Sequence, residues 1–336
     1  MNSIIPLPDT WQTLLSQTLE SPEALIRYLD LPESLLEGAN RAHAEFAMRI
    51  PRPWLDRIEK GNLNDPLLRQ VLPLGEEMDD VPGFTQDPLE EMHSNPVEGL
   101  IHKYKGRVLV ILTGACAINC RYCFRRHFPY ADNRLGPTQW QKIIAYITAD
   151  SSITEIIFSG GDPLVSSDAR LKQFITDLEQ IPHLTRLRIH SRLPVVLPQR
   201  ITESLTQVLQ QTRLKVVTVI HSNHPQELDE QVANAVQRLH QAGVTVFNQA
   251  VLLRGINDSC EILKGLSEKL FDIGVLPYYL FTFDPVKGAA HFDIPDSEAK
   301  QLLQQLQDQL PGYLVPRLAR EIPGRGSKTL LSLDQD

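Results

Sequence analysis

The sequence predicts an α/β protein whose core is an open, partial (β/α)6 barrel. Short apolar or β-branched runs alternate with longer segments of helical period. The six strand-like runs are 107–113, 155–158, 186–190, 214–220, 244–248 and 276–283. The helical segments between them are 138–149, 168–180, 200–211, 226–241 and 260–273. This alternation favours a parallel sheet with right-handed crossovers, and six units are too few to close an eight-stranded barrel. A doubly wound open sheet is the alternative arrangement.

The chain divides into a helical N-terminal extension at 1–101, the partial-barrel core at 102–320 and a short C-terminal segment at 321–336. The extension is punctuated by proline. The Ser-Pro-Glu run that starts at Ser21 predicts a helix start, because it combines a capping hydroxyl, a first-turn proline and an early acid.

Composition and charge limit the possible partners. The formal net charge of −8 argues against a broad surface for nucleic acid or anionic membrane. No apolar run reaches membrane-spanning length, and the start MNSIIPLPDT lacks the basic and apolar regions of a signal peptide. We therefore expect a cytoplasmic protein with no nucleic acid and no membrane among its partners. Basic residues gather instead beside three cysteines, at Arg121, Arg125, Arg126 and His127, which suits a small anion in a pocket.

Polar residues follow each of the six predicted strands. A cysteine loop follows the first strand, and the SGGD run at 159–162 follows the second. The later strands are followed by His190, Ser191 and Arg192, by His221 to His224, by Asn248 and Gln249, and by Asp284. In a β/α barrel the carboxyl ends of the strands converge on one mouth, where active sites are built. We therefore expect these residues to share one site.

The cysteine loop has the spacing C-x3-C-x2-C, formed by Cys116, Cys120 and Cys123. A structural zinc site needs four ligands, usually as two separated pairs. Three thiolates on one loop can instead hold three irons of a four-iron cluster and leave the fourth iron open. Cys260 could in principle add a fourth ligand, but no second cysteine or histidine accompanies it. Three neighbouring cysteines without a shared role are the plainer interpretation, which this metal-like spacing disfavours.

This spacing, followed by the aromatic Phe124 and placed after the first strand of six, resembles the radical S-adenosylmethionine superfamily. From about Lys103 to Lys328 the chain resembles the lysine 2,3-aminomutase family, with motifs in the same order. More narrowly, it is similar to the shorter bacterial subfamily that supplies β-lysine for modification of elongation factor P. The stretch NDPLLRQVLP agrees with that subfamily.

The resemblance implies a role for each matching residue. Cys116, Cys120 and Cys123 would ligate a [4Fe-4S] cluster whose fourth iron S-adenosylmethionine chelates. The positions that match contacts to S-adenosylmethionine are Ser159, Gly160, Gly161, Asp162, Ser191, Arg192, His221 and Gln249. The positions that match contacts to pyridoxal 5′-phosphate are Lys103, Tyr104, Arg107 and Lys328, and Lys328 would be the catalytic Schiff-base lysine.

The resemblance also implies how lysine is bound as the substrate. Arg125 would clamp its carboxylate, and Asp284 with Glu321 would bind its distal ammonium. Two carboxylates that face one pocket repel each other unless a cation lies between them. The pair therefore favours a diamine-type substrate over glutamate, the substrate of the nearest rival aminomutase.

The implied reaction moves nitrogen from C2 to C3 of L-lysine by radical chemistry and yields (R)-β-lysine. The implied partners are elongation factor P with its lysyl-ligase-like modifying enzyme, and an external electron donor such as flavodoxin. A non-isomerising iron–sulfur carrier or scaffold is the alternative from another class. Such a protein would need the cysteines, but not Lys328 together with Arg125 and the paired acids.

Three positions depart from the metabolic lysine aminomutases. Glu321 stands where those enzymes have aspartate, and Lys103 stands where they have arginine. Ser259 stands where they have a cysteine that contributes to a zinc site between subunits, so we expect no such zinc here.

Overall fold

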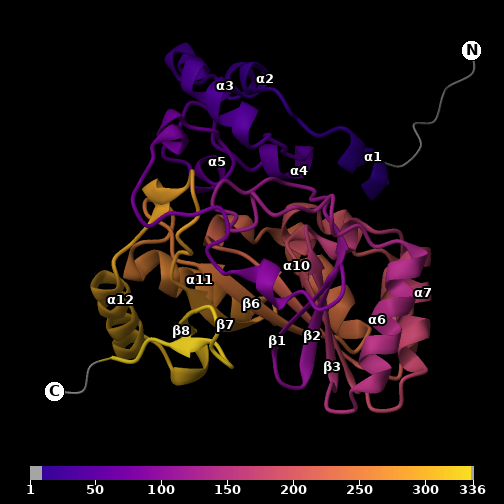
Figure 1. The fold of residues 1–336 in the computed structure, drawn as a ribbon. Coiled ribbons are helices and arrows are strands. Elements are labelled where there is room, and N and C mark those ends of the chain that lie inside the picture. Colours follow the sequence, from indigo (N-terminus) through magenta and orange to yellow (C-terminus); the bar gives the residue numbers. More distant parts are fainter. Residues whose placement is uncertain (1–9, 334–336) are drawn as a thin grey trace, which may run out of the picture.

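One sheet of nine strands runs in the order β1 to β9 through the part of the chain that the structure describes (Figure 1). The structure is a computed structural model and describes residues 10–333. The first nine residues, where we expect no signal peptide, and the last three residues of the predicted C-terminal segment lie outside it. The strands are β1 (Leu100–Tyr104), β2 (Arg107–Thr113), β3 (Glu155–Gly160), β4 (Arg186–Ser191), β5 (Lys215–His221), β6 (Thr245–Val251), β7 (Leu276–Phe281), β8 (Arg317–Arg320) and β9 (Thr329–Leu330).

The strands β2 to β8 are parallel, while β1 and β9 pair antiparallel at the two edges. The strand order is linear, so the described sheet is a partial barrel and the predicted fold class is confirmed. The six predicted strands correspond to β2 to β7. The strands β1, β8 and β9 were not predicted, because each is short and pairs at an end of the sheet.

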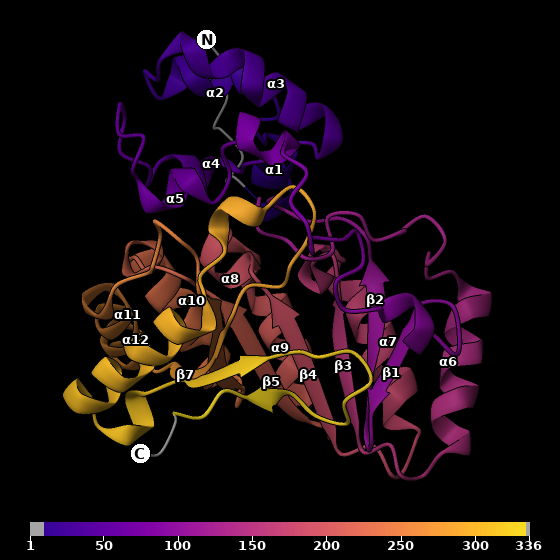
Figure 2. The same cartoon turned by 60° about the vertical axis from the view of Figure 1, so that its left-hand side comes forward.

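Helices cover the outer face of the sheet, and the sheet curves around the opposite face (Figure 2). They are α6 (Pro137–Ala149), α7 (Asp168–Glu179), α8 (Leu193–Val196), α9 (Glu203–Gln211), α10 (Glu230–Gln241), α11 (Cys260–Asp272) and α12 (Asp296–Gln309). Two helices begin later than the sequence predicts. Thr202 caps α9 and Asp229 caps α10, and a capping residue stands outside the helix that it starts.

The N-terminal extension forms a helical layer above the carboxyl ends of the strands (Figures 1 and 2). Its helices are α1 (Trp11–Ser16), α2 (Pro22–Tyr28), α3 (Leu36–Glu45), α4 (Arg52–Leu55) and α5 (Pro66–Arg69). The helix start predicted at Ser21 is confirmed, because its hydroxyl accepts a hydrogen bond from the backbone N–H of Ala24. Buried apolar side chains of this layer and of the sheet belong to one continuous core. The layer is therefore packed onto the mouth of the barrel.

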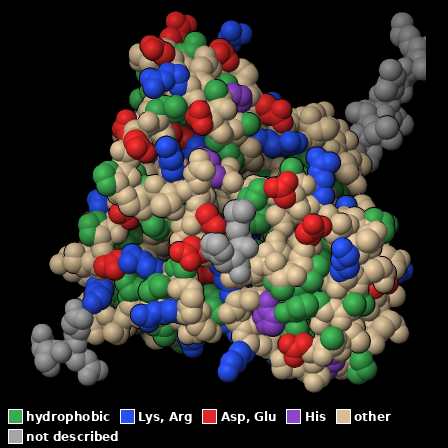
Figure 3. All heavy atoms as spheres, in the orientation of Figure 1, with side chains coloured by type: hydrophobic (Ala, Val, Ile, Leu, Met, Phe, Trp, Pro, Cys, Tyr) green, Lys and Arg blue, Asp and Glu red, His purple; other side chains and the backbone are tan. Residues whose placement is uncertain are grey.

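No helix in residues 10–333 is long and apolar enough to cross a membrane. On the face shown in Figure 3, acidic and basic side chains are interspersed rather than gathered by sign.

Candidate functional site

A cavity of about 640 Å³ lies against the sheet, and every strand from β1 to β9 contributes to its lining. Ten residues predicted for the site line it, namely Lys103, Tyr104, Arg107, Arg125, Ser159, His221, Gln249, Asp284, Glu321 and Lys328. The other predicted residues lie outside this lining, and the contacts below place most of them around the cysteine loop. The site therefore has two parts, which we call the cavity and the cysteine loop.

The edge hairpin of β8 and β9 brings Glu321 and Lys328 together. Arg320 pairs with Thr329, so the next residues inward, Glu321 and Lys328, face each other across the hairpin loop. The Lys328 Nζ lies 2.9 Å from Glu321 Oε2 and 4.5 Å from the centre of the Phe281 ring. The side chain of Lys328 is 22% exposed, so this lysine belongs to the cavity and not to the open surface.

Glu321 bridges two lysines from opposite edges of the sheet. Its Oε1 accepts a hydrogen bond from Lys103 Nζ at 2.8 Å, and its Oε2 accepts one from Lys328. Burial opposes ionisation of this carboxyl, but the two ammonium groups outweigh burial and lower its pKa to about 2. Glu321 is therefore a carboxylate at neutral pH.

Asp284 lines the same cavity, but the nearby lysines do not offset its burial as they do for Glu321. Burial and then the charge of Glu321 raise the pKa of Asp284 to about 7, although Lys328 acts in the opposite direction. Two carboxylates in one pocket push the ionisation of one of them upward. A second cation placed between Asp284 and Glu321 would relieve that repulsion.

Arg125 is held by a carboxylate that sequence analysis did not identify. Its Nε and Nη2 donate to the two oxygens of Glu91, at 2.6 Å and 2.9 Å, and Glu91 is 4% exposed. Its Nη1 lies 3.3 Å from Ser159 Oγ and 3.4 Å from the carbonyl oxygen of Gly160. Glu91 also lies 3.3 Å from Lys103 Nζ. The bidentate pair occupies the edge between Nε and Nη2, and a second carboxylate entering the cavity would share Nη1 with Ser159 and Gly160.

Two histidines place unpartnered nitrogens in the cavity lining. His190 and His221 pack edge to face with ring centres 6.0 Å apart, and the Nε2 of each is buried without a hydrogen-bond partner. Burial lowers the pKa of His221 to about 3 and that of His190 well below its ordinary value, so both rings are neutral. Buried polar atoms without partners are rare and indicate a missing ligand or water. The lining therefore fits a bound group that offers hydrogen-bonding atoms.

Lys103 and Arg107 flank the β1–β2 hairpin at the other side of the cavity. The Arg107 guanidinium stacks on the ring of Tyr104, 4.5 Å from its centre. Two cations with a phenol hydroxyl suit a phosphate dianion, and Lys328 supplies an amine in the same cavity. These residues fit pyridoxal phosphate, although their individual contacts with it remain predictions.

The cysteine loop joins β2 to α6, and all three of its cysteines are partly exposed free thiols. Burial, followed by neighbouring thiols, raises the pKa of Cys123 to about 11 and that of Cys116 well above its ordinary value. At neutral pH such thiols are protonated, and a bound metal ion would convert them to thiolates. In the described part of the chain, no group of three His, Cys, Asp or Glu side chains converges enough to hold a single metal ion. The thiols of Cys123 and Cys120 both act on the pKa of Cys116, so the three lie near one another, as ligands to separate irons of one cluster would.

The glycines of the SGGD run are required by the cysteine loop itself. Gly160 has φ +116°, and a Cβ there would lie 2.6 Å from the carbonyl oxygen of Thr113. A Cβ on Gly161 would overlap the carbonyl oxygen of Ala115. The N–H groups of Gly161 and Asp162 donate to those same two oxygens, at 2.8 Å and 2.9 Å. The end of β3 therefore supports the loop directly beneath the cysteines.

Asp162 joins the ends of β3 and β4. Its side chain accepts hydrogen bonds from Ser191 Oγ at 2.7 Å and from the backbone N–H of Arg192 at 2.8 Å and of Leu193 at 3.1 Å. Asp162 and Ser191 are thus engaged with each other in this structure. Their contact with S-adenosylmethionine remains a prediction, as it does for Arg192, whose Nη1 lies 2.7 Å from Cys120 Sγ.

Comparison with known proteins decides the family. The sequence pattern of the Radical SAM superfamily matches residues 110–264. The chain is 51% identical to "L-lysine 2,3-aminomutase" of Escherichia coli K12, over 98% of this chain and 96% of that protein. The chain belongs to the lysine 2,3-aminomutase family. It is accordingly an isomerase of the radical SAM type, as the sequence motifs predict.

Other members of the lysine 2,3-aminomutase family match with similar coverage of this chain. The relative from Haemophilus influenzae is 50% identical over 97% of each chain. The relative from Clostridium subterminale is 37% identical over 95% of this chain and 77% of its own length. The resemblance stated from the motifs is thereby confirmed at the level of the family.

Sequence analysis missed Glu91, and it placed His190 at the shared site without giving it a role. Glu91 lies in a short 3-10 turn (Glu91–Ser94), within an acidic stretch that has no strand or helix period. Its neighbour Glu90 is equally acidic, so only the fold shows which carboxylate faces Arg125. His190 directly precedes Ser191 and Arg192, which were assigned to S-adenosylmethionine. Side chains alternate between the two faces of a strand, so the position of His190 along β4 could have placed it on the cavity side.

Proposed function

We propose that this protein is an L-lysine 2,3-aminomutase that uses a [4Fe-4S] cluster, S-adenosylmethionine and pyridoxal 5′-phosphate and forms (R)-β-lysine. The observation that supports it most is the charge arrangement of one cavity. An arginine suited to an α-carboxylate, an amine with phosphate-binding cations, and two acids suited to a distal ammonium line the same space. A glutamate substrate would bring a third carboxylate toward Asp284 and Glu321, where burial and the charge of Glu321 already raise the pKa of Asp284, so its negative charge would be repelled.

When bound, the cluster with S-adenosylmethionine supplies one-electron hydrogen abstraction, and pyridoxal phosphate supplies the π system on which the amino group migrates. The cluster would be held by Cys116, Cys120 and Cys123. Lys328 would hold pyridoxal phosphate, with Lys103, Tyr104 and Arg107 around its phosphate. The contributions of the protein are to bind the substrate at both ends, to orient it and to exclude water.

Arg125 would hold the substrate carboxylate with the guanidinium edge that Glu91 does not occupy. Asp284 and Glu321 would hold the distal ammonium, which fixes the carbon chain between two charged anchors. Binding at both ends restricts how C2 and C3 can lie, and orientation of this kind contributes a large part of catalysis. The aromatic wall of Phe247, Tyr279 and Phe281 makes part of the lining apolar and disfavours water.

The lysines of the cavity would change partners during loading. Lys103 and Lys328 both pair with Glu321. If these two lysines held pyridoxal phosphate, they would be less available to Glu321, and the carboxylate of Glu321 could pair with the substrate ammonium instead.

The finer parts of the proposal rest on the resemblance to the shorter subfamily. We propose that the β-lysine serves modification of elongation factor P, that an external donor such as flavodoxin reduces the cluster, and that the protein acts in the cytoplasm.

The test is anaerobic incubation of reconstituted protein with free L-lysine or L-glutamate, S-adenosylmethionine and a reductant. Chiral chromatography identifies the product. We expect (R)-β-lysine from lysine and no β-glutamate. Formation of β-glutamate with lysine unchanged would reject the substrate assignment, and formation of neither product would reject the activity with these free amino acids. Transfer of the β-lysine to elongation factor P by its modifying enzyme tests the physiological role.

A further inference from the structure

The guanidinium of Arg192 is aimed at one sulfur of the cysteine loop. Arg192 follows β4 and is 6% exposed, and its Nη1 donates to Cys120 Sγ at 2.7 Å. The guanidinium carbon lies 4.6 Å from the ring centre of Trp54 and 5.5 Å from that of Tyr122. Two aromatic rings therefore limit where this cation can move. The residues that hold the opposite end of the guanidinium determine how it meets the sulfur.

Gln70 and Glu227 hold the other end of the guanidinium. Arg192 Nη2 donates to Gln70 Oε1 at 2.6 Å and lies 3.3 Å from Glu227 Oε2. Gln70 Nε2 in turn donates to Glu227 Oε1 at 2.9 Å. Both side chains are 0% exposed. Gln70 follows helix α5 of the N-terminal layer, whereas Glu227 ends a 3-10 turn after β5.

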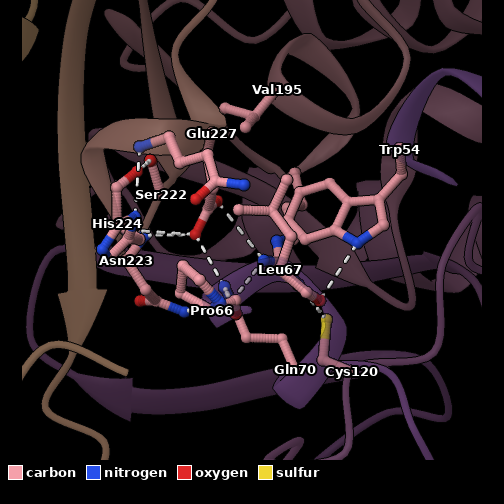
Figure 4. Close-up of polar contacts among 12 residues, drawn as sticks. Trp54, Pro66, Leu67, Gln70, Cys120, Val195, Ser222, Asn223, His224 and Glu227 are labelled. Carbon is pink, nitrogen blue, oxygen red and sulfur yellow. Dashed lines mark hydrogen bonds and ion pairs between the residues drawn. The ribbon is translucent and has the colours of Figure 1, made fainter. Parts of the chain in front are cut away.

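Asn223 completes the network and leaves Gln70 little freedom. Its Nδ2 donates to Gln70 Oε1 at 3.0 Å and to the Tyr122 hydroxyl at 2.8 Å, and its backbone N–H donates to Glu227 Oε1 at 3.0 Å. Figure 4 shows Gln70, Asn223 and Glu227 pointing toward one another from separate segments. Buried networks in which each member is bonded are rigid. Arg192 is thus clamped by the N-terminal layer on one side and by the β5 loop on the other.

We propose that Gln70 is a positioning residue that holds Arg192 against Cys120 and thereby raises the reduction potential of the cluster. This inference rests on the proposed cluster at the three cysteines. Hydrogen bonds to cluster sulfurs and nearby charge help to set reduction potentials. Reduction adds one electron, and a cationic donor on a ligand sulfur stabilises the more negative state. Gln70 is neutral and, among the described residues, its side chain has no hydrogen bond to a cysteine, so we expect its effect on the potential to pass through the geometry of Arg192.

The experiment is an anaerobic redox titration of the full-length, cluster-reconstituted protein, followed by EPR without S-adenosylmethionine or lysine. Omitting S-adenosylmethionine separates the effect on the cluster from any effect on cofactor binding. The variants are Gln70→Leu, Arg192→Gln and the double variant, with iron content confirmed for each. Arg200→Gln is the matched control, because Arg200 is a fully buried arginine that bonds to Leu164, Ser166 and Asp168 and to no cysteine.

We expect Arg192→Gln to shift the potential to more negative values by about 59 mV or more, a tenfold change in the one-electron equilibrium. Gln70→Leu should reproduce most of that shift, the double variant should equal Arg192→Gln alone, and Arg200→Gln should match the parent. Such non-additivity is the signature of one residue acting through another. If Gln70→Leu does not assemble a cluster, Gln70→Asn, which withdraws the amide by one methylene, carries the same prediction.

An unchanged potential in Gln70→Leu, beside a shifted one in Arg192→Gln, would overturn the positioning role. Additive shifts in the double variant would overturn it as well, because the two residues would then act independently. Unchanged potentials in all variants would show that the contact with the sulfur does not influence the cluster. A parent protein that binds no cluster would instead reject the proposed function, and this inference with it.

Discussion

The cavity and the network behind Cys120 use charge in opposite ways. In the cavity, Glu321 is shared by two lysines, and burial with the charge of Glu321 raises the pKa of Asp284 to about 7, so the charges there are unequally compensated. Behind the cysteine loop, Gln70 and Glu227 are fully buried and Arg192 almost so, and the three hydrogen-bond to one another. If the two parts bind the groups proposed for them, substrate and pyridoxal phosphate are met by charges that can change partners, whereas the cluster is met by charges fixed in advance.

Lys328→Ala should have the largest effect, because it removes the only group in the cavity proposed to bond covalently with pyridoxal phosphate. We expect loss of detectable aminomutase activity. In the parent protein, borohydride should fix the cofactor to the peptide that contains Lys328. Mass spectrometry of the digested protein locates the label. Labelling of another lysine, together with activity in Lys328→Ala, would contradict the assignment of Lys328 as the lysine that binds pyridoxal phosphate.

Glu321→Gln should weaken the use of lysine strongly. A buried ammonium that loses one of two counter-charges costs about 2–5 kcal/mol, or roughly 30-fold to several thousandfold in kcat/KM. Glu321→Asp should preserve or raise the turnover of free lysine, because the shorter acid is the residue of the metabolic enzymes. Glu298→Gln, which alters an ion pair with Arg254 outside the cavity lining, is the control. A glutamine variant as active as the parent would place Glu321 outside substrate binding, and an inactive aspartate variant would show that the longer acid is fitted to its substrate.

Glu91→Gln sharpens the comparison, because the bidentate pair of Glu91 with Arg125 lies in the cavity and yet resembles the fixed network. Losing the charge-assisted pair with Arg125 should cost about 1.5–3 kcal/mol, which appears as a rise in KM for lysine of roughly ten- to a hundredfold. The value of kcat should change less, since the carboxylate anchor contributes mainly to binding. Steady-state kinetics separates the two parameters, and Glu91→Asp should recover part of the loss. A fall in KM would mean that Glu91 competes with the substrate carboxylate and does not orient Arg125.

The pH dependence of lysine binding should be the smallest effect. Asp284 has a pKa of about 7, above its ordinary value, so it is mostly neutral at pH 6 and mostly ionised at pH 8. The distal ammonium of lysine keeps its charge throughout this range. The KM for lysine should therefore fall by up to roughly tenfold as pH rises through 7. Asp284→Asn should abolish this dependence, and its persistence in that variant would assign it to another group.

The sequence was sufficient for the six central strands and for the cysteine motif, because apolar strand runs and ligand spacing are local patterns. It could not show the β8–β9 hairpin, since β9 has two residues and gains its stability only by pairing with β8. This hairpin is what places Lys328 opposite Glu321. Partners far apart in sequence, such as Glu91 with Arg125 or Gln70 with Arg192, are set by tertiary packing and leave no periodic signal.

The most direct measurement compares lysine with norleucine, which has the same carbon skeleton but no distal ammonium. Binding of each to the pyridoxal phosphate-loaded protein can be followed by the cofactor's absorbance, without S-adenosylmethionine or reductant. If Asp284 and Glu321 recognise the distal ammonium, lysine should bind at least about 30-fold more tightly than norleucine in the parent protein. That preference should disappear in the double variant Asp284→Asn/Glu321→Gln. An equal affinity for the two amino acids in the parent, or an undiminished preference in the double variant, would contradict the proposed recognition of lysine.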